Sequence, residues 1–238
     1  MRVHAGCFAL FALLSNLSSA AVFSIEQQNA ASAHQRLMLW QSALITSCTG
    51  HFSGGGDAAV PFVSYIWRAN ELKYSLMQDL VWPTVPEAAK TSSKTDAEQL
   101  QGKLASASPA EQIRICDGLS HTLISPDSHF NRKTPDAAKV LDAMFDSHPE
   151  LQLKAHKEDM TAGCMIQNFN AGGRVFATAK SICDCKMTAL FTQVPEKELK
   201  EWFDEIDHKH VDPLTLIDRP SYRRAQPAML ACQPALLK

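Results

Sequence analysis

Apolar residues recur at helical spacing over much of the chain. In the first such segment they stand every three or four positions, at Ala30, Ala33, Leu37, Trp40, Leu44 and Cys48. Ser24 precedes this stripe, and Gln27 stands three residues after Ser24, which is the spacing of a capping box. The pattern predicts a helix of about six turns that ends near Cys48.

A second stripe follows a glycine-rich stretch at residues 53–57. Its members are Phe62, Ile66, Ala69, Leu72, Leu76 and Leu80. Pro61 suits the first turn of a helix, whereas Pro83 and Pro86 cannot continue one. One helix from Pro61 to about Leu80 is therefore predicted.

Three further helices are indicated by their first residues. The sequence 108–111, Ser-Pro-Ala-Glu, is a capping box with proline at the first helical position, and Thr134-Pro135 repeats the device. Pro149 is expected to end the helix that Pro135 begins. The clearest amphipathic pattern begins at Pro195 and places its apolar residues on one face, at Leu199, Trp202, Phe203 and Ile206.

Other segments are less regular. Residues 87–107 are polar and small, which is typical of a linker or a mobile excursion, with at most a short helix from residue 96 to residue 104. Gly172-Gly173 interrupts the segment 159–191, and only the part after the glycines fits a helix. From Pro213 onward the chain contains four prolines and little periodicity.

The fold class predicted from these patterns is mainly α. We find no alternating strand pattern and no repeat of fixed period. We expect a compact, disulfide-stapled helical bundle with long connecting loops, formed as a single domain by residues 21–238. Those 218 residues are enough to bury a sizeable core.

Residues 1–20 have the layout of a cleaved export signal. A basic Arg2 is followed by an apolar run from Ala5 to Leu14 and by small residues up to Ala20. The run is far shorter than the roughly 20 residues that cross a bilayer. The alternative, a lipid-modified Cys7, requires an aliphatic residue where His4 stands. The sequence therefore predicts a periplasmic or secreted protein with no membrane span.

The charge of the expected mature chain excludes some partners. Removal of Arg2 leaves 22 basic residues against 25 acidic ones, a net charge of −3 with histidine neutral. A basic surface for nucleic acid or an anionic membrane is therefore not expected. The mature chain also lacks an Asn-x-Ser/Thr sequon, which favours a bacterial periplasm over a glycosylating route.

Six cysteines remain after Cys7 leaves with the signal. They are Cys48, Cys116, Cys164, Cys183, Cys185 and Cys232. An even number in an exported chain predicts three disulfides, for which fifteen pairings exist.

Cys183 and Cys185 are separated by a single residue. On a helix they lie about 200° apart around the axis, so they are expected to bond different partners. In this interpretation their helix is a hub, bonded to Cys164 upstream and to Cys232 downstream, which leaves the other two cysteines for each other. A redox pair or a zinc site is less favoured, because Asp184 would raise the pKa of the thiols and no second ligand pair follows at the usual spacing.

The densest group of potential metal ligands or acid–base groups lies between residues 204 and 212. Its members are Asp204, Glu205, Asp207, His208, His210 and Asp212. Asp204 and His208 are four residues apart and could share a helix face. However, Glu196 and Glu198 stand in the first turn and the histidines in the last, an arrangement that the helix dipole favours. We therefore predict a solvated helix end, no metal and no cofactor, and keep Asp204, His208 and His210 as the metal candidates.

A polar segment at residues 125–136 lies between two predicted helices. It carries Asp127, His129 and Arg132, and polar loops often carry function. Trp82, beside a proline, is expected to be partly exposed and to suit an interface anchor. We treat these four residues as the candidate contact surface for a partner.

No motif in the chain identifies a reaction. The glycine-rich stretch lacks the Gly-Lys-Ser/Thr of a phosphate-binding loop, and G-x-S-x-G is absent. The first function class is an exported binding protein, an inhibitor or immunity-type protein that neutralises a toxic hydrolase by occluding it. The second is an envelope assembly or adaptor protein. The third is a metal-dependent enzyme that uses the 204–212 group. We favour a non-enzymatic role.

Overall fold

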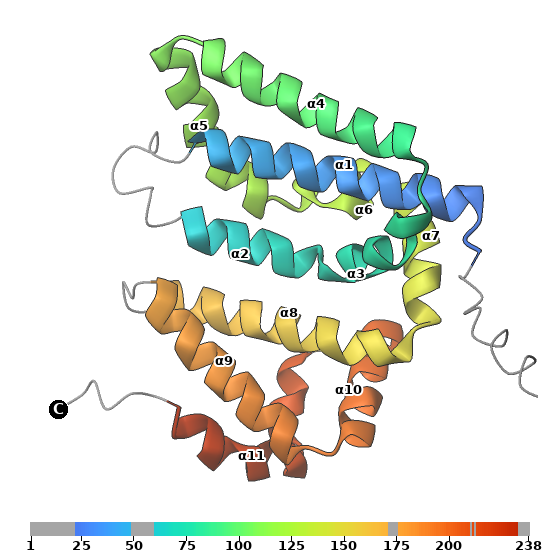
Figure 1. Ribbon diagram of the computed structural model, residues 1–238. Helices are drawn as coiled ribbons and strands as arrows, with labels where there is room; N and C mark the ends of the chain where they lie inside the picture. The colour runs from blue at the N-terminus through green and yellow to red at the C-terminus, as the bar shows by residue number, and fades with distance from the viewer. Residues whose placement is uncertain (1–21, 49–59, 171–175, 210, 212, 233–238) are drawn as a thin grey trace, which may run out of the picture.

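The computed structural model describes residues 22–48, 60–170, 176–209, 211 and 213–232 (Figure 1). These residues form eleven α-helices joined by short 3₁₀ turns and connections, and they contain no strand. The helices are α1 (Ile25–Cys48), α2 (Val60–Asn70), α3 (Leu72–Val81), α4 (Glu87–Ser106), α5 (Pro109–Ile124), α6 (Phe130–Lys133), α7 (Pro135–Asp146), α8 (Pro149–Asn170), α9 (Phe176–Gln193), α10 (Glu196–Lys209) and α11 (Pro220–Leu230). The predicted fold class, mainly α and compact, is confirmed. The expected export signal, residues 1–20, lies outside the described residues.

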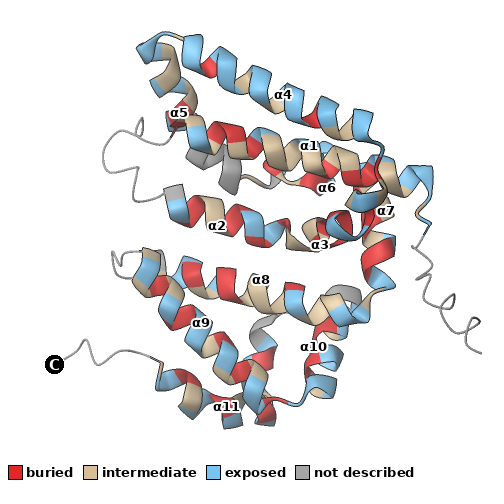
Figure 2. Ribbon diagram, in the orientation of Figure 1, coloured by how far each residue is buried: buried red, intermediate tan, exposed pale blue. Residues whose placement is uncertain are grey.

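The helices stack in layers (Figure 1). α1 packs against α4 on one side and against α3 and α7 on the other. α2 and α3 in turn contact α8, and α8 contacts α9, which packs against α11. Figure 2 shows buried positions turned towards neighbouring helices and exposed positions on the outer faces of α4 and α11.

Three apolar clusters fill the spaces between these layers. Trp67 and Met165 belong to the cluster between α2, α5, α8 and α9, and Phe130 belongs to the cluster that α1, α3 and α7 enclose. Trp202 and Leu190 belong to the third cluster, around α9, α10 and α11. Each of these five side chains is 0% exposed, so burying them contributes on the order of 2 kcal/mol apiece.

All six cysteines of the expected mature chain form disulfides. Cys48 bonds Cys116, Cys164 bonds Cys183, and Cys185 bonds Cys232. This is the pairing of the hub interpretation, with the two neighbouring cysteines of α9 reaching α8 on one side and the end of α11 on the other.

Two of the expected caps form, to different extents, whereas Thr134 at the start of α7 makes no side-chain capping hydrogen bond. Ser24 N–H donates to Gln27 Oε1 at 2.8 Å, and Gln27 N–H donates to Ser24 Oγ at 3.1 Å, so both arms of the first box are present. At the start of α5, Glu111 N–H donates to Ser108 Oγ at 3.3 Å, whereas the Glu111 carboxylate pairs with Arg114.

The segment 87–107 is not a linker, since residues 87–106 form the continuous helix α4 packed along α1. Its inward positions follow helical spacing, but the residues are small or isolated: Ser93 and Leu104 are buried, and Ala89 and Leu100 are partly buried. An ion pair of 3.3 Å between Arg36 and Asp96 also joins the two helices. The expectation of a linker was wrong because small residues give a weak apolar stripe that still packs closely.

Two prolines also have roles other than those expected. Pro149 is the first residue of α8, so it begins a helix instead of ending one, and only Ser147 and His148 separate α7 from α8. Pro227 lies inside α11, whose buried face consists of Ser221, Ala225 and Met229 at intervals of four residues. The connection between α7 and α8 is therefore shorter than the long loops that we expected.

Candidate functional site

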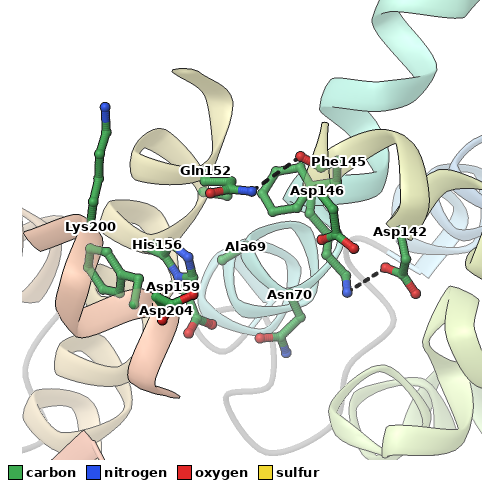
Figure 3. Close-up of a pocket in the computed structure, with 13 residues that line it drawn as sticks. Ala69, Asn70, Asp142, Phe145, Asp146, Gln152, His156, Asp159, Lys200 and Asp204 are labelled. Carbon is green, nitrogen blue, oxygen red and sulfur yellow. Dashed lines mark hydrogen bonds and ion pairs between the residues drawn. The ribbon is translucent and has the colours of Figure 1, made fainter. Parts of the chain in front are cut away.

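A pocket of about 500 Å³ opens between α7, α8, α10 and the junction of α2 with α3 (Figure 3). Its lining comprises Ala69, Asn70 and Lys73 from the junction, Asp142, Phe145 and Asp146 from α7, Gln152, Ala155, His156 and Asp159 from α8, and Lys200, Phe203 and Asp204 from α10. Four segments that are far apart in the sequence thus meet at one cavity.

The charged groups of the pocket are predominantly acidic. Four aspartates face two lysines in the lining. Lys73 Nζ lies 2.7 Å from Asp142 Oδ1, and Lys200 Nζ lies 2.6 Å from Glu196, which is outside the lining. Burial would lower the pKa of Lys73, but its contacts with Asp142 and Tyr74 outweigh burial and raise that pKa. Lys73 therefore stays a cation that compensates Asp142.

Aromatic rings form the apolar part of the wall. The His156 ring stacks on Phe203 with the ring centroids 3.9 Å apart and the planes at 4°. Phe145 also lines the pocket and is buried, and its carbonyl oxygen accepts a hydrogen bond of 3.4 Å from Gln152 Nε2. The pocket thus combines carboxylates with flat apolar surface, which suits a group that carries a positive charge on an aliphatic stem.

A buried carboxylate, Glu71, lies at the junction of α2 with α3, between the lining residues Asn70 and Lys73. Glu71 interrupts the helix that the sequence predicts from Pro61 to Leu80 and separates α2 from α3, with φ −93° and ψ 0°. Its side chain is 0% exposed and points away from the solvent, whereas the adjacent Asn70 and nearby Lys73 line the pocket.

Glu71 binds three partners from distant parts of the chain. Its Oε1 accepts hydrogen bonds from His129 Nδ1 at 2.9 Å and from the Phe130 N–H at 3.0 Å, and its Oε2 lies 3.5 Å from His34 Nε2. His34 Nδ1 lies 2.7 Å from Gln78 Oε1, which places α1 in the same network. Burial alone would raise the pKa of Glu71, but its contacts with His129, His34 and the Phe130 N–H outweigh burial and hold the pKa below its usual value.

The predicted contact residues do not gather at this pocket. His129 is largely buried and belongs to the Glu71 network, while Asp127 and Arg132, on either side of it, are exposed. Trp82 is half-buried against the cluster around Phe130, and Lys90 Nζ lies 5.8 Å from the centre of its ring. His129 therefore has a structural partner, and the roles of the other three residues in binding stay predictions.

The metal candidates are only partly described. Asp204 lines the pocket, and its Oδ2 lies 3.6 Å from Lys209 Nζ. The side chain of His208 and the whole of His210 lie outside the described part of the chain. Within that part, no three or more histidine, cysteine, aspartate or glutamate side chains are grouped closely enough to hold a metal ion.

No local sequence pattern indicates the pocket as a whole. Asp142 and Asp146 are four residues apart on α7, and this spacing could have indicated a shared helix face. Nothing local connects them to Asp159 or to Asp204, however, because the three helices meet only through tertiary packing.

No helix among the described residues has both the length and the apolar character needed to cross a membrane. Comparison of the chain with protein-family models, with curated proteins and with solved structures gave no match.

Proposed function

We propose that this chain is an exported binding protein that occludes a partner protein, as an inhibitor or immunity-type protein does against a toxic hydrolase. We further propose that the pocket receives a basic side chain of that partner. The observation that carries the proposal is the convergence of Asp142, Asp146, Asp159 and Asp204 around a cavity with an aromatic wall.

The size and chemistry of the pocket support this occupant. A cavity of about 500 Å³ is large enough to hold one long side chain. An arginine or lysine side chain would place its cation among the carboxylates and its methylene stem on Phe203 and His156. Electrostatic complementarity of this kind speeds association and selects the partner.

The frame around the pocket supports occlusion as the mode of action. A blocking protein binds tightly when its surface is ordered before binding, because little conformational entropy is then lost. Here Glu71 anchors the junction of α2 with α3 to Phe130 of α6. The Cys164–Cys183 disulfide joins α8, which lines the pocket, to α9. Three disulfides also suit an oxidising compartment outside the cytoplasm, which is the basis for proposing export.

The test uses the oxidised mature protein as bait in an extract of the cell envelope. A partner that co-elutes in stoichiometric amount is identified by mass spectrometry, and its hydrolytic activity is then measured with and without added protein. We expect capture of one partner and loss of its activity. Capture should weaken as salt rises, because the contact is between charges.

Two variants test whether the partner binds at the pocket. The double variant Asp146→Asn/Asp159→Asn removes two exposed carboxylates of the lining and should reduce affinity at least about tenfold, which corresponds to about 1.4 kcal/mol. Asp79→Asn makes the same chemical change at an exposed site on α3 outside the lining and should have no effect. Equal loss in both proteins would refute the pocket as the contact, and a captured partner that stays fully active would refute occlusion.

A further inference from the structure

The three disulfides differ in their access to solvent. In the first, Cys48 and Cys116 are 0% and 2% exposed. In the second, Cys183 is 0% exposed and its partner is half-buried. In the third, Cys185 is exposed and Cys232 is half-buried. A thiol reagent therefore reaches one disulfide far more easily than the other two.

The exposed disulfide also lies in a hollow of the surface. This hollow, of about 610 Å³, is lined by Cys185, Cys232, Ala177, Thr178, Ser181, Ile182 and Ala231. Most of these side chains are small, so an incoming sulfur atom meets little steric hindrance. Access is one of the factors that decide which disulfide exchanges with a thiol.

We infer that the Cys185–Cys232 disulfide is a thiol–disulfide exchange site whose reactant is a dithiol, such as the reduced active site of a thiol–disulfide oxidoreductase. This inference does not depend on the proposed function. A thiolate of the dithiol attacks Cys185 Sγ, the Cys185–Cys232 bond breaks, and its electron pair leaves with Cys232 Sγ, which takes up a proton.

The second thiol of the reactant completes the exchange. As a thiolate, it attacks the reactant sulfur of the mixed disulfide, so that Cys185 is released and takes up a proton. The dithiol is thereby oxidised to a disulfide by loss of two electrons, and the two cysteines gain those electrons and two protons. The new Cys232 thiol has an acceptor at hand, because its Sγ lies 3.5 Å from the Ala228 carbonyl oxygen.

The surrounding packing allows this exchange without unfolding. Ala225 and Met229 of α11 are buried in the same cluster as Met187 and Leu190 of α9, so the two helices remain packed when the covalent bond is lost. Reduction of the Cys48–Cys116 bond instead requires an opening that exposes the core, which is rare in the folded state.

The experiment exposes the folded, oxidised protein to a limiting amount of dithiothreitol, traps free thiols with iodoacetamide and locates them by peptide mass spectrometry. Cys185 and Cys232 should be labelled at least about tenfold faster than the other four cysteines, at a rate that mild urea does not change. Labelling of all six together, or of another pair first, would overturn the inference.

A variant separates exchange from unfolding. In Cys185→Ser/Cys232→Ser the exchange site is absent, so no thiol should become labelled during the same exposure. Labelling of the remaining cysteines in this variant at the wild-type rate would show that reduction occurs elsewhere and would also overturn the inference. Reduced glutathione provides the regiochemical test, since its single thiol should form a mixed disulfide on Cys185 and not on Cys232.

Discussion

Replacement of Glu71 tests the buried network most directly. In Glu71→Ala the Phe130 N–H and the His129 ring lose their acceptor, and Phe130 is 0% exposed, so water cannot take over. A buried group left unpaired costs about 1–3 kcal/mol, and breaking a buried charged contact costs about 3–5 kcal/mol in total. We therefore expect Glu71→Ala to lower the free energy of unfolding by about 3–5 kcal/mol.

The substitution Glu71→Gln tests the contribution of the negative charge of Glu71 separately from its shape. Glu71→Gln keeps the shape and one acceptor oxygen, so the hydrogen bonds persist but lose the strength that an ionised acceptor gives. The expected loss is about 1–2 kcal/mol. Glu98→Gln serves as the matched control, because Glu98 is 61% exposed and lies 3.8 Å from Lys94, a surface pair worth about 0–1 kcal/mol.

The pH dependence of the loss follows from the lowered pKa of Glu71. Because the pKa is lower in the folded chain than in the unfolded chain, the unfolded state binds more protons as the pH falls. The stabilisation from the ionised carboxylate is therefore complete above the ordinary value of 4.5 and is lost as the pH falls below it towards the folded pKa. The difference between wild type and Glu71→Gln should shrink over that range.

The assay is urea unfolding at several pH values, followed by tryptophan fluorescence with the disulfides intact and extrapolated linearly to water. A Glu71→Ala protein within about 0.5 kcal/mol of wild type would refute the reasoning, because it would mean that the buried donors find other partners. A difference between wild type and Glu71→Gln that grows on acidification would contradict the assigned direction of the pKa shift.

Three further predictions concern a helix cap, a disulfide and an aromatic contact. Ser24→Ala removes one arm of the capping box of α1 and should lower the unfolding free energy by about 1 kcal/mol, measured by urea unfolding. Joint replacement of Cys48 and Cys116 by serine opens a loop of 68 residues and should cost about 4 kcal/mol, which a fall in the thermal midpoint would reveal. His156→Ala removes the stacking on Phe203 and should cost about 1 kcal/mol beyond lost area, a value that a double-mutant cycle with Phe203→Leu can check.

The features that the sequence predicts correctly are those that depend on nearby residues. The Ser24 and Gln27 capping box forms because its atoms are three positions apart, and the helix from residue 25 to residue 48 follows from the apolar spacing. The opposite directions of Cys183 and Cys185 follow from the turn of one helix. α4 was missed because its stripe contains Ala89 and Ser93, which bury little apolar area and yet let α4 lie close to α1.

The candidate site could not be predicted in the same way, because it depends on contacts between residues that are far apart in the sequence. Glu71 lies between two positions of a continuous apolar stripe, and the local pattern treats it as a polar residue on a helix surface. Its burial is compensated by His34, 37 positions before it, and by His129 and the Phe130 N–H, 58 and 59 positions after it.

The Glu71 carboxylate also anchors the junction of α2 with α3, which lines the pocket. Backbone hydrogen bonds from the Glu71 N–H to the Trp67 carbonyl and from the Ser75 N–H to the Glu71 carbonyl span the junction of α2 with α3. The Glu71 side chain links this junction to His129, next to the start of α6, and Lys73 links it to Asp142 of α7. The junction of α2 with α3 thus supplies both Glu71 of the buried network and the lining residues Asn70 and Lys73. It follows that the negative charge buried at Glu71 serves the fold, because its acceptor oxygens are used by His129 and by the Phe130 N–H within the chain.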